Sequence, residues 1–143
     1  MEKIVGRRNG RVNALRVLYL LDVYKNLTVE EAIKTVFNEI EFETDTREFF
    51  EKIVKGTLNN IQIIDSYIEK HTINWKLDRM ATVDKNIMRI ATYEMMNMPE
   101  TPINVIIDEA VEIAKQYSNS DSSKFINGIL DKVKIIRKEL NNK

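Results

Sequence analysis

The stretch TPINVIIDEAVEIAKQY, residues 101–117, shows the pattern that decides the fold of this chain. Its apolar side chains recur at spacings of three and four residues, which places them on one face of an α-helix. Thr101 is a favourable N-cap residue, and Pro102 follows at the position where a helix tolerates a missing backbone N–H. The stretch is therefore predicted to be an amphipathic helix. Its buried face consists of Ile103, Ile106, Ile107, Ala110, Ala114 and Tyr117.

The same helical period recurs along almost the whole chain. Residues 11–24 are apolar nearly all round, apart from a polar stripe of Asn9, Asn13 and Arg16, which predicts a central, buried helix. Thr28 and Glu31 have the spacing of a capping box, and they predict the start of a second helix. Strand signals are absent, and the chain is predicted to be a compact all-α domain of about six to seven helices. The remaining predicted helices cover residues 45–68, 83–98 and 121–140, the last of them capped by Asp121 or Ser122.

The weakest helical stretch runs from Thr72 to Arg79 and is the best candidate for a joint. It divides a single domain of 143 residues into two three-helix halves of about 1–74 and 75–143. One domain is the expectation for this length. The longest apolar run, Leu15 to Val23, contains two charged residues and is too short to span a bilayer. Without a secretory segment and without cysteine, the sequence predicts a cytoplasmic protein.

A net charge of zero conceals a segregated charge distribution. Residues 1–25 carry six basic and two acidic side chains, whereas residues 28–51 carry eight acidic and two basic ones. Residues 124–143 are basic again, with six basic and two acidic side chains. Basic ends of this kind can present a face that binds a polyanion. The alternative is that the charges solvate helix surfaces.

The residues that enzymes use for catalysis are not arranged in any recognisable motif. His71 is the single histidine, and it suits the C-terminal end of a helix better than a metal site. The four glycines match neither a phosphate-binding loop nor a dinucleotide fingerprint, and no serine lies between glycines at the spacing of a nucleophile elbow. We therefore expect no catalytic residue, no metal site and no cofactor, and a protein that is not an enzyme.

Two local features point to nucleic acid instead. The first comprises Arg7, Arg8 and Arg11 at the start of the first helix, because guanidinium groups bind phosphate oxygens bidentately and stack on bases. The second is DSSKFING, residues 121–128, which combines a lysine, an aromatic ring and an amide that suit an unpaired base. The structural alternative makes the arginines a solvated tail, Phe125 a core residue and Gly128 a helix-packing notch.

Three blocks of the sequence resemble the NusB family. The stretch Trp75 to Glu94 looks like its middle signature, residues 102–115 look like its fifth helix, and residues 121–132 are similar to its most distinctive block. The arginine-rich start and the Leu18-Tyr19 pair also match its N-terminal helix. Residues 26–72 contribute least to the resemblance.

The resemblance implies a non-enzymatic transcription antitermination factor. Such a protein binds single-stranded boxA RNA in ribosomal-operon leaders jointly with ribosomal protein NusE, and it acts on RNA polymerase within an antitermination complex. Two residues, Tyr19 and Asp84, match positions associated with NusE, and Asp84 is expected to be solvent-exposed. By matching positions, the RNA-binding residues are Arg7, Arg8, Arg11, Asp121, Lys124, Phe125 and Asn127.

The sequence departs from the family pattern at three positions. Asn9 and Gly10 interrupt the arginine run, which predicts a less helical arm, and Ser123 replaces a common histidine. The sequence also has features of two other classes of protein. A helical adaptor that binds only protein stays open, whereas the similar module of ribosomal-RNA cytosine methyltransferases would need a cofactor domain that this sequence does not contain. A homodimer also stays open as an alternative to a monomer, and no membrane association is expected.

Overall fold

The computed structural model of this chain describes residues 3–73 and 76–141. Trp75, part of the middle signature, lies outside them. Contacts divide the chain into two compact units, Met1–Gly56 and Thr57–Lys143. The boundary therefore lies after Gly56, whereas the sequence placed a joint near Thr72 to Arg79. The segment that follows Gly56 belongs to the second unit because it packs on helices of that unit.

The first unit is a small helical assembly with one pair of very short strands. Its helix α1 is buried mainly between Gly10 and Leu18, as the apolar sequence of that stretch predicts, whereas its two ends are half-buried or exposed. Asn13, expected on the polar stripe, is also buried, but its amide donates to the Asn9 carbonyl oxygen at 2.8 Å. The elements are β1 (Lys3–Ile4), α1 (Arg7–Val23), α2 (Val29–Phe37), β2 (Glu41–Phe42) and α3 (Thr44–Asn59), the last of which runs across the boundary between the units.

The capping box at the start of α2 is confirmed. The Thr28 hydroxyl accepts from the Glu31 backbone N–H at 3.1 Å, and the Glu31 carboxylate accepts from the Thr28 backbone N–H at 3.0 Å. The hydrogen bond from the Thr28 backbone N–H to the carboxylate, and next the nearby Thr28 hydroxyl, hold the pKa of Glu31 below its ordinary value. At the other end of α2, an aromatic cluster joins it to β2 and α3. Its rings belong to Phe37, Phe42 and Phe50, with centroids 4.8–5.7 Å apart.

The parallel pairing of β1 with β2 corrects the expectation that the chain has no strands. Lys3 pairs with Glu41, and Ile4 pairs with Phe42. Two residues per strand are too few to show an alternating pattern, and the partners lie far apart in the sequence. The pair adds little regular structure, so the all-α class is confirmed for the described residues.

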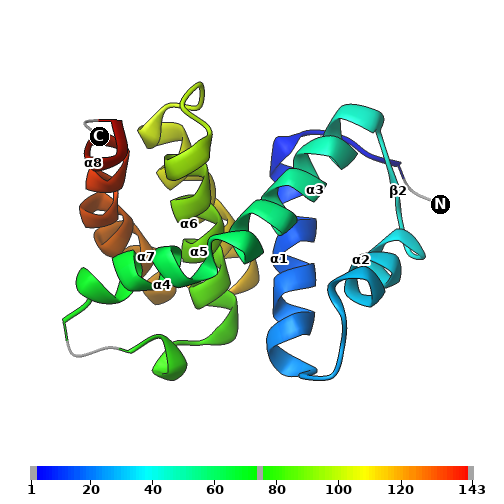
Figure 1. The fold of residues 1–143 in the computed structure, drawn as a ribbon, viewed down its shortest axis with the longest axis horizontal. Helices are drawn as coiled ribbons and strands as arrows, with labels where there is room; N and C mark the ends of the chain where they lie inside the picture. The colour runs from blue at the N-terminus through cyan, green and yellow to red at the C-terminus, as the bar shows by residue number, and fades with distance from the viewer. Residues whose placement is uncertain (1–2, 74–75, 142–143) are drawn as a thin grey trace. The chain divides into compact units, whose positions relative to one another are not determined.

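The second unit is built around α5 (Thr82–Asn97). This helix contacts four others, and ten of its sixteen residues are buried. Figure 1 shows it among the green-to-red helices of this unit. In the described part of the chain no helix is long and apolar enough to cross a membrane. The other elements are α4 (Ile61–Lys70), the 3-10 turn η1 (Leu77–Arg79), α6 (Ile103–Tyr117), α7 (Ser120–Val133) and α8 (Ile135–Asn141).

Two predicted helices are each divided in the structure. The helix expected over residues 45–68 is interrupted at Asn60, whose φ of −115° and ψ of 17° depart from helical values. The helix expected over residues 121–140 is interrupted at Lys134. Apolar residues continue with helical spacing across both points, so periodicity alone does not reveal the breaks. Asparagine is a weak helix former because its amide competes for backbone hydrogen bonds.

The start of α6 differs from the sequence prediction. Pro102 is the N-cap residue, and Thr101 lies before the helix as a buried residue. The prediction that Thr101 is the N-cap is therefore wrong. Its carbonyl oxygen instead accepts a hydrogen bond from the Arg137 guanidinium at 2.8 Å.

Arg137 fastens α8 to the C-terminal end of α5. The last carbonyl oxygens of a helix have no partner within it. The Arg137 guanidinium donates to several of these oxygens, which its planar, five-donor shape allows. The acceptors are the backbone carbonyl oxygens of Glu94, Met95, Met98 and Thr101, at 2.8–3.3 Å.

Candidate nucleic-acid interface

The arginines of the first unit open helix α1 rather than preceding it. The helix begins at Arg7, directly after Gly6, whose φ of 99° is a conformation that glycine adopts without steric cost. The Gly6 backbone N–H donates to the Thr46 hydroxyl at 2.8 Å, which anchors this entry to α3. Arg7 and Arg8 are exposed, whereas Arg11 is only 4% exposed. The three predicted RNA-binding arginines therefore do not share one environment.

Arg7 and Arg11 both contact the ring of Phe49. Their guanidinium carbons lie 4.8 Å and 5.2 Å from the ring centroid, within the range of a cation–π interaction. A spacing of four residues puts both side chains on one face of α1. Phe49 is itself buried, so Arg11 is held between the helix and the core of the unit.

Gly10 allows this close packing. A Cβ atom at this position would lie 2.9 Å from Cδ2 of Phe49, which is shorter than ordinary carbon–carbon contacts. Gly10 is buried inside α1, so the expectation that it makes the arm less helical is wrong. It is a contact point between α1 and α3.

In the second unit, the residues of the DSSKFING stretch lie on the first turns of α7. The N-cap is Asn119, whose side-chain oxygen accepts from the Ser122 backbone N–H at 2.8 Å. The prediction that Asp121 or Ser122 caps this helix is therefore wrong. Asp121, Lys124 and Asn127 are exposed, and the last two lie outside the pocket described below.

Phe125 and Gly128 depart from the structural alternative. Phe125 is half-buried rather than part of the core. A Cβ atom added to Gly128 would meet nothing within 4 Å, so this glycine is not a helix-packing notch. Ser123 is buried, and its hydroxyl donates to the Ser120 carbonyl oxygen at 2.7 Å.

Asp84, expected to be exposed, is 7% exposed. It lies in the first turn of α5, and the start of α7 covers it. The Ser122 hydroxyl donates to Oδ2 of Asp84 at 2.7 Å. The other oxygen, Oδ1, is buried and has no hydrogen-bond partner among the described residues. A buried carboxylate oxygen without a partner is costly, which makes this atom a candidate acceptor for a ligand's donor group.

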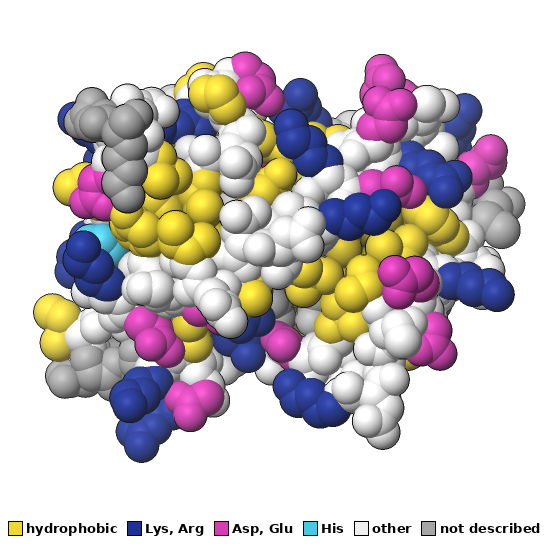
Figure 2. Space-filling model, viewed as in Figure 1, with side chains coloured by type: hydrophobic (Ala, Val, Ile, Leu, Met, Phe, Trp, Pro, Cys, Tyr) yellow, Lys and Arg dark blue, Asp and Glu magenta, His cyan; other side chains and the backbone are white. Residues whose placement is uncertain are grey.

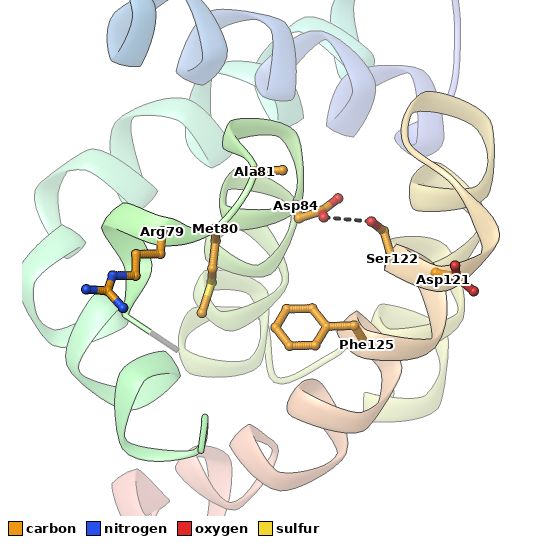
Figure 3. Close-up of a pocket in the computed structure, with 7 residues that line it drawn as sticks. All are labelled: Arg79, Met80, Ala81, Asp84, Asp121, Ser122 and Phe125. Carbon is orange, nitrogen blue, oxygen red and sulfur yellow. Dashed lines mark hydrogen bonds between the residues drawn. The ribbon is translucent and has the colours of Figure 1, made fainter. Parts of the chain in front are cut away.

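A pocket of about 310 Å³ lies beside this carboxylate. Figure 3 shows the hydrogen bond from Ser122 to Asp84 and the Phe125 ring pointing from α7 toward Met80. The side chains of Arg79 and Asp121 point away from the ring, toward opposite sides of the view. The pocket thus combines an aromatic wall with a buried acceptor. Its lining consists of Arg79, Met80, Ala81, Asp84, Asp121, Ser122 and Phe125.

Sequence reasoning did not select Arg79, Met80 or Ser122 as site residues. All three lay within the quoted blocks, but nothing local in the sequence shows that η1 and the start of α7 meet beside Asp84. In the described parts of the chain, no three His, Asp or Glu side chains are grouped so that they could hold a metal ion.

Tyr19, the other predicted partner-binding residue, is 40% exposed on α1 of the first unit. Val23, one helical turn later, and Tyr24 are also exposed, at 45% and 59%. This end of α1 therefore presents a small apolar surface. On the face shown in Figure 2, Lys and Arg side chains are interspersed with Asp and Glu, so charge alone does not mark a binding surface there.

Comparison with known proteins gives a consistent result. The sequence profile described as the NusB family matches residues 8–134. The transcription antitermination protein NusB of Halothermothrix orenii is 46% identical over 130 residues, which cover 90% of this chain and 96% of the relative. That of Bacillus subtilis is 41% identical over 128 residues, or 90% and 94% of the two chains. The chain spans only 61% of a third relative, from Chloroherpeton thalassium, to which it is 44% identical.

Solved structures agree in fold over the same length. T. maritima NusB aligns over the whole of both chains with a TM-score of 0.87 and 32% identity. A chain in the crystal structure of antitermination factors NusB and NusE in complex with dsRNA aligns with a TM-score of 0.80 and 30% identity. That alignment covers 93% of this chain and 96% of the other.

Proposed function

This chain belongs to the NusB family, and on that premise we propose that it is a transcription antitermination factor. It binds boxA-type leader RNA together with ribosomal protein NusE and helps RNA polymerase resist premature termination of ribosomal RNA operons. The observation that carries the proposal is the similarity, over 93% of this chain, to a protein solved in complex with NusE and RNA.

On the RNA side, Arg7 and Arg8 bind phosphate at the exposed start of α1. Both side chains are accessible, and guanidinium groups match phosphate geometry. Arg11 packs on the ring of Phe49 and so holds in place the start of α1, on which the other two arginines lie. On α7, Lys124 supplies a further cation, Asp121 and Asn127 supply polar groups, and Phe125 offers its half-buried ring to an unpaired base.

On the protein side, Tyr19 and Asp84 contact NusE. The unpartnered Oδ1 of Asp84 suits an arginine, lysine or backbone N–H donor of the partner, which would reach it through the adjoining pocket. Tyr19 suits a partner because its ring is apolar and its hydroxyl is polar. Among the described residues, three buried side-chain atoms have no hydrogen-bond partner, and Oδ1 of Asp84 belongs to the one of these residues that lines the pocket.

A titration with RNA tests the proposal. The protein is titrated with boxA RNA and with a scrambled RNA of equal length, each with and without NusE. We expect boxA to bind more tightly than the scrambled RNA, and NusE to increase the difference. Equal affinity for both RNAs in the presence of NusE would refute sequence-specific RNA binding. Binding of NusE without any RNA binding would instead support a helical protein–protein adaptor, which the exposed Tyr24 side chain also suits.

A further inference from the structure

One hydrogen bond connects the two helices that carry the candidate RNA and NusE residues of the second unit. Ser122 lies in the first turn of α7, beside Asp121 and one turn before Phe125. Its hydroxyl reaches across 38 residues of sequence to Oδ2 of Asp84, in the first turn of α5. Figure 3 shows this bond as the link between the two elements at the pocket.

The bond determines where Asp84 directs its free acceptor. Asp84 is almost fully buried, and the structure records one hydrogen bond to its carboxylate within the described residues. When Oδ2 is held by Ser122, the orientation of the carboxylate is fixed, and with it the direction of Oδ1. A small displacement of the first turn of α7 would move the Ser122 hydroxyl and turn Oδ1 with it.

We propose that Ser122 is a positioning residue that couples RNA binding to partner binding. RNA held by Asp121 and Phe125 fixes the first turn of α7, Ser122 then fixes Asp84, and Asp84 receives the donor of the protein partner. This inference rests on the proposed function of the two sites. The coupling is reciprocal, because a ligand that strengthens the binding of another is strengthened by the same factor.

The test measures how much NusE increases affinity for boxA RNA in variants at position 122. Ser122→Thr keeps a hydroxyl. Ser122→Val introduces a side chain of nearly the same shape as threonine, but without the hydroxyl. In the wild type we expect NusE to increase RNA affinity by a factor within roughly 5–150, the usual range of coupling. Ser122→Val should lower this factor toward one, by at most about tenfold, as the loss of a hydrogen bond to a charged group predicts, and Ser122→Thr should retain it.

Two controls separate coupling from simple loss of structure. RNA affinity is measured without NusE in each variant and the factor is taken relative to it, so a direct effect of Ser122, which lines the same pocket as Phe125, is not counted as coupling. Ser120→Ala, on the same turn, should leave the factor unchanged, since the bond of Ser120 to Ser123 uses its backbone carbonyl oxygen. Circular dichroism confirms that each variant is folded.

The outcomes distinguish this inference from the proposed function. If the wild type binds neither RNA nor NusE, the proposed function fails and the inference fails with it. If both ligands bind but the factor is the same in Ser122→Val as in the wild type, only the inference is overturned. Equal losses in Ser122→Thr and Ser122→Val would also overturn it, because the hydroxyl would then be irrelevant.

Discussion

Arg11 provides the sharpest test of how the arginines at the start of α1 divide their roles. It is 4% exposed and lies over Phe49, whereas Arg7 and Arg8 are exposed. Each phosphate contact on single-stranded RNA contributes about 0.7 to the slope of log affinity against log salt concentration. Replacing Arg7 and Arg8 with alanine should therefore flatten the slope by about 1.4. The free energy of unfolding should fall by no more than about 0.5–1 kcal/mol, the contribution of the exposed cation–π contact between Arg7 and Phe49.

Arg11→Ala should behave in the opposite way. It removes a cation–π contact of about 0.5–2 kcal/mol and the packing of a buried side-chain stem, so unfolding should become easier by about 1–3 kcal/mol. The salt slope should change by less than about 0.7, the contribution of one phosphate contact. Urea titrations give the unfolding free energies, and RNA binding at several salt concentrations gives the slopes.

Arg16→Ala is the matched control on the same helix. Arg16 pairs with Glu39 and with the side-chain oxygen of Asn13, and it is not a proposed RNA contact. Its replacement should leave the salt slope unchanged. The reasoning is refuted if Arg11→Ala flattens the salt slope as much as Arg7→Ala does while the free energy of unfolding stays at the wild-type value. The burial of Arg11 would then not separate a structural residue from an RNA-binding one.

Three further predictions concern the second unit. Arg137→Met leaves several backbone carbonyl oxygens at and just after the end of α5 without their donor. It should lower the free energy of unfolding, measured by urea denaturation, by about 2–4 kcal/mol. As a control, replacing the exposed Lys138 with alanine should change this free energy by less than about 0.5 kcal/mol. Phe125→Ala should weaken boxA binding by about 1–3 kcal/mol with an unchanged salt slope, and a destabilisation of about 3–5 kcal/mol would show instead that the ring belongs to the core. The hydrogen bond to Glu139 raises the pKa of Tyr67 above its ordinary value. The contribution of this hydrogen bond to the stability of the folded protein is therefore fully present below the unfolded pKa of about 10, and it is lost as pH rises through the folded pKa. Glu139→Gln should bring the Tyr67 pKa back toward about 10 in an NMR titration, and an unchanged pKa would exclude this cause.

Features that depend on neighbouring residues were predictable from the sequence. The helical period indicated the all-α class, and the Thr28–Glu31 capping box was confirmed atom for atom, because its partners lie three residues apart. The nearly continuous apolar surface of residues 11–24 likewise indicated that the middle of α1 is buried, but it did not reveal that Tyr19, Val23 and Tyr24 are exposed.

Features that depend on distant residues were not predictable in this way. Asp84 was expected to be exposed because a carboxylate suits the first turn of a helix, but the start of α7 covers it. Arg11 appeared to be one of three equivalent arginines until Phe49 was placed against it. The pairing of β1 with β2 joins residues about 38 positions apart, which no local pattern indicates. The roles of the site residues in binding stay predictions.

The hydrogen bonds that join Arg137 to the end of α5 also bear on the order in which this chain folds during synthesis. A helix of seven residues such as α8 is too short to persist alone in water, so it forms only when it docks. Until Arg137 has left the ribosome, the carbonyl oxygens at the end of α5 must be satisfied by water, and this central helix lacks its outer cover. The second unit therefore completes its core only after α8 has been synthesised, and a ribosome that stalls before that point holds a nascent chain with α5 exposed to chaperones and proteases.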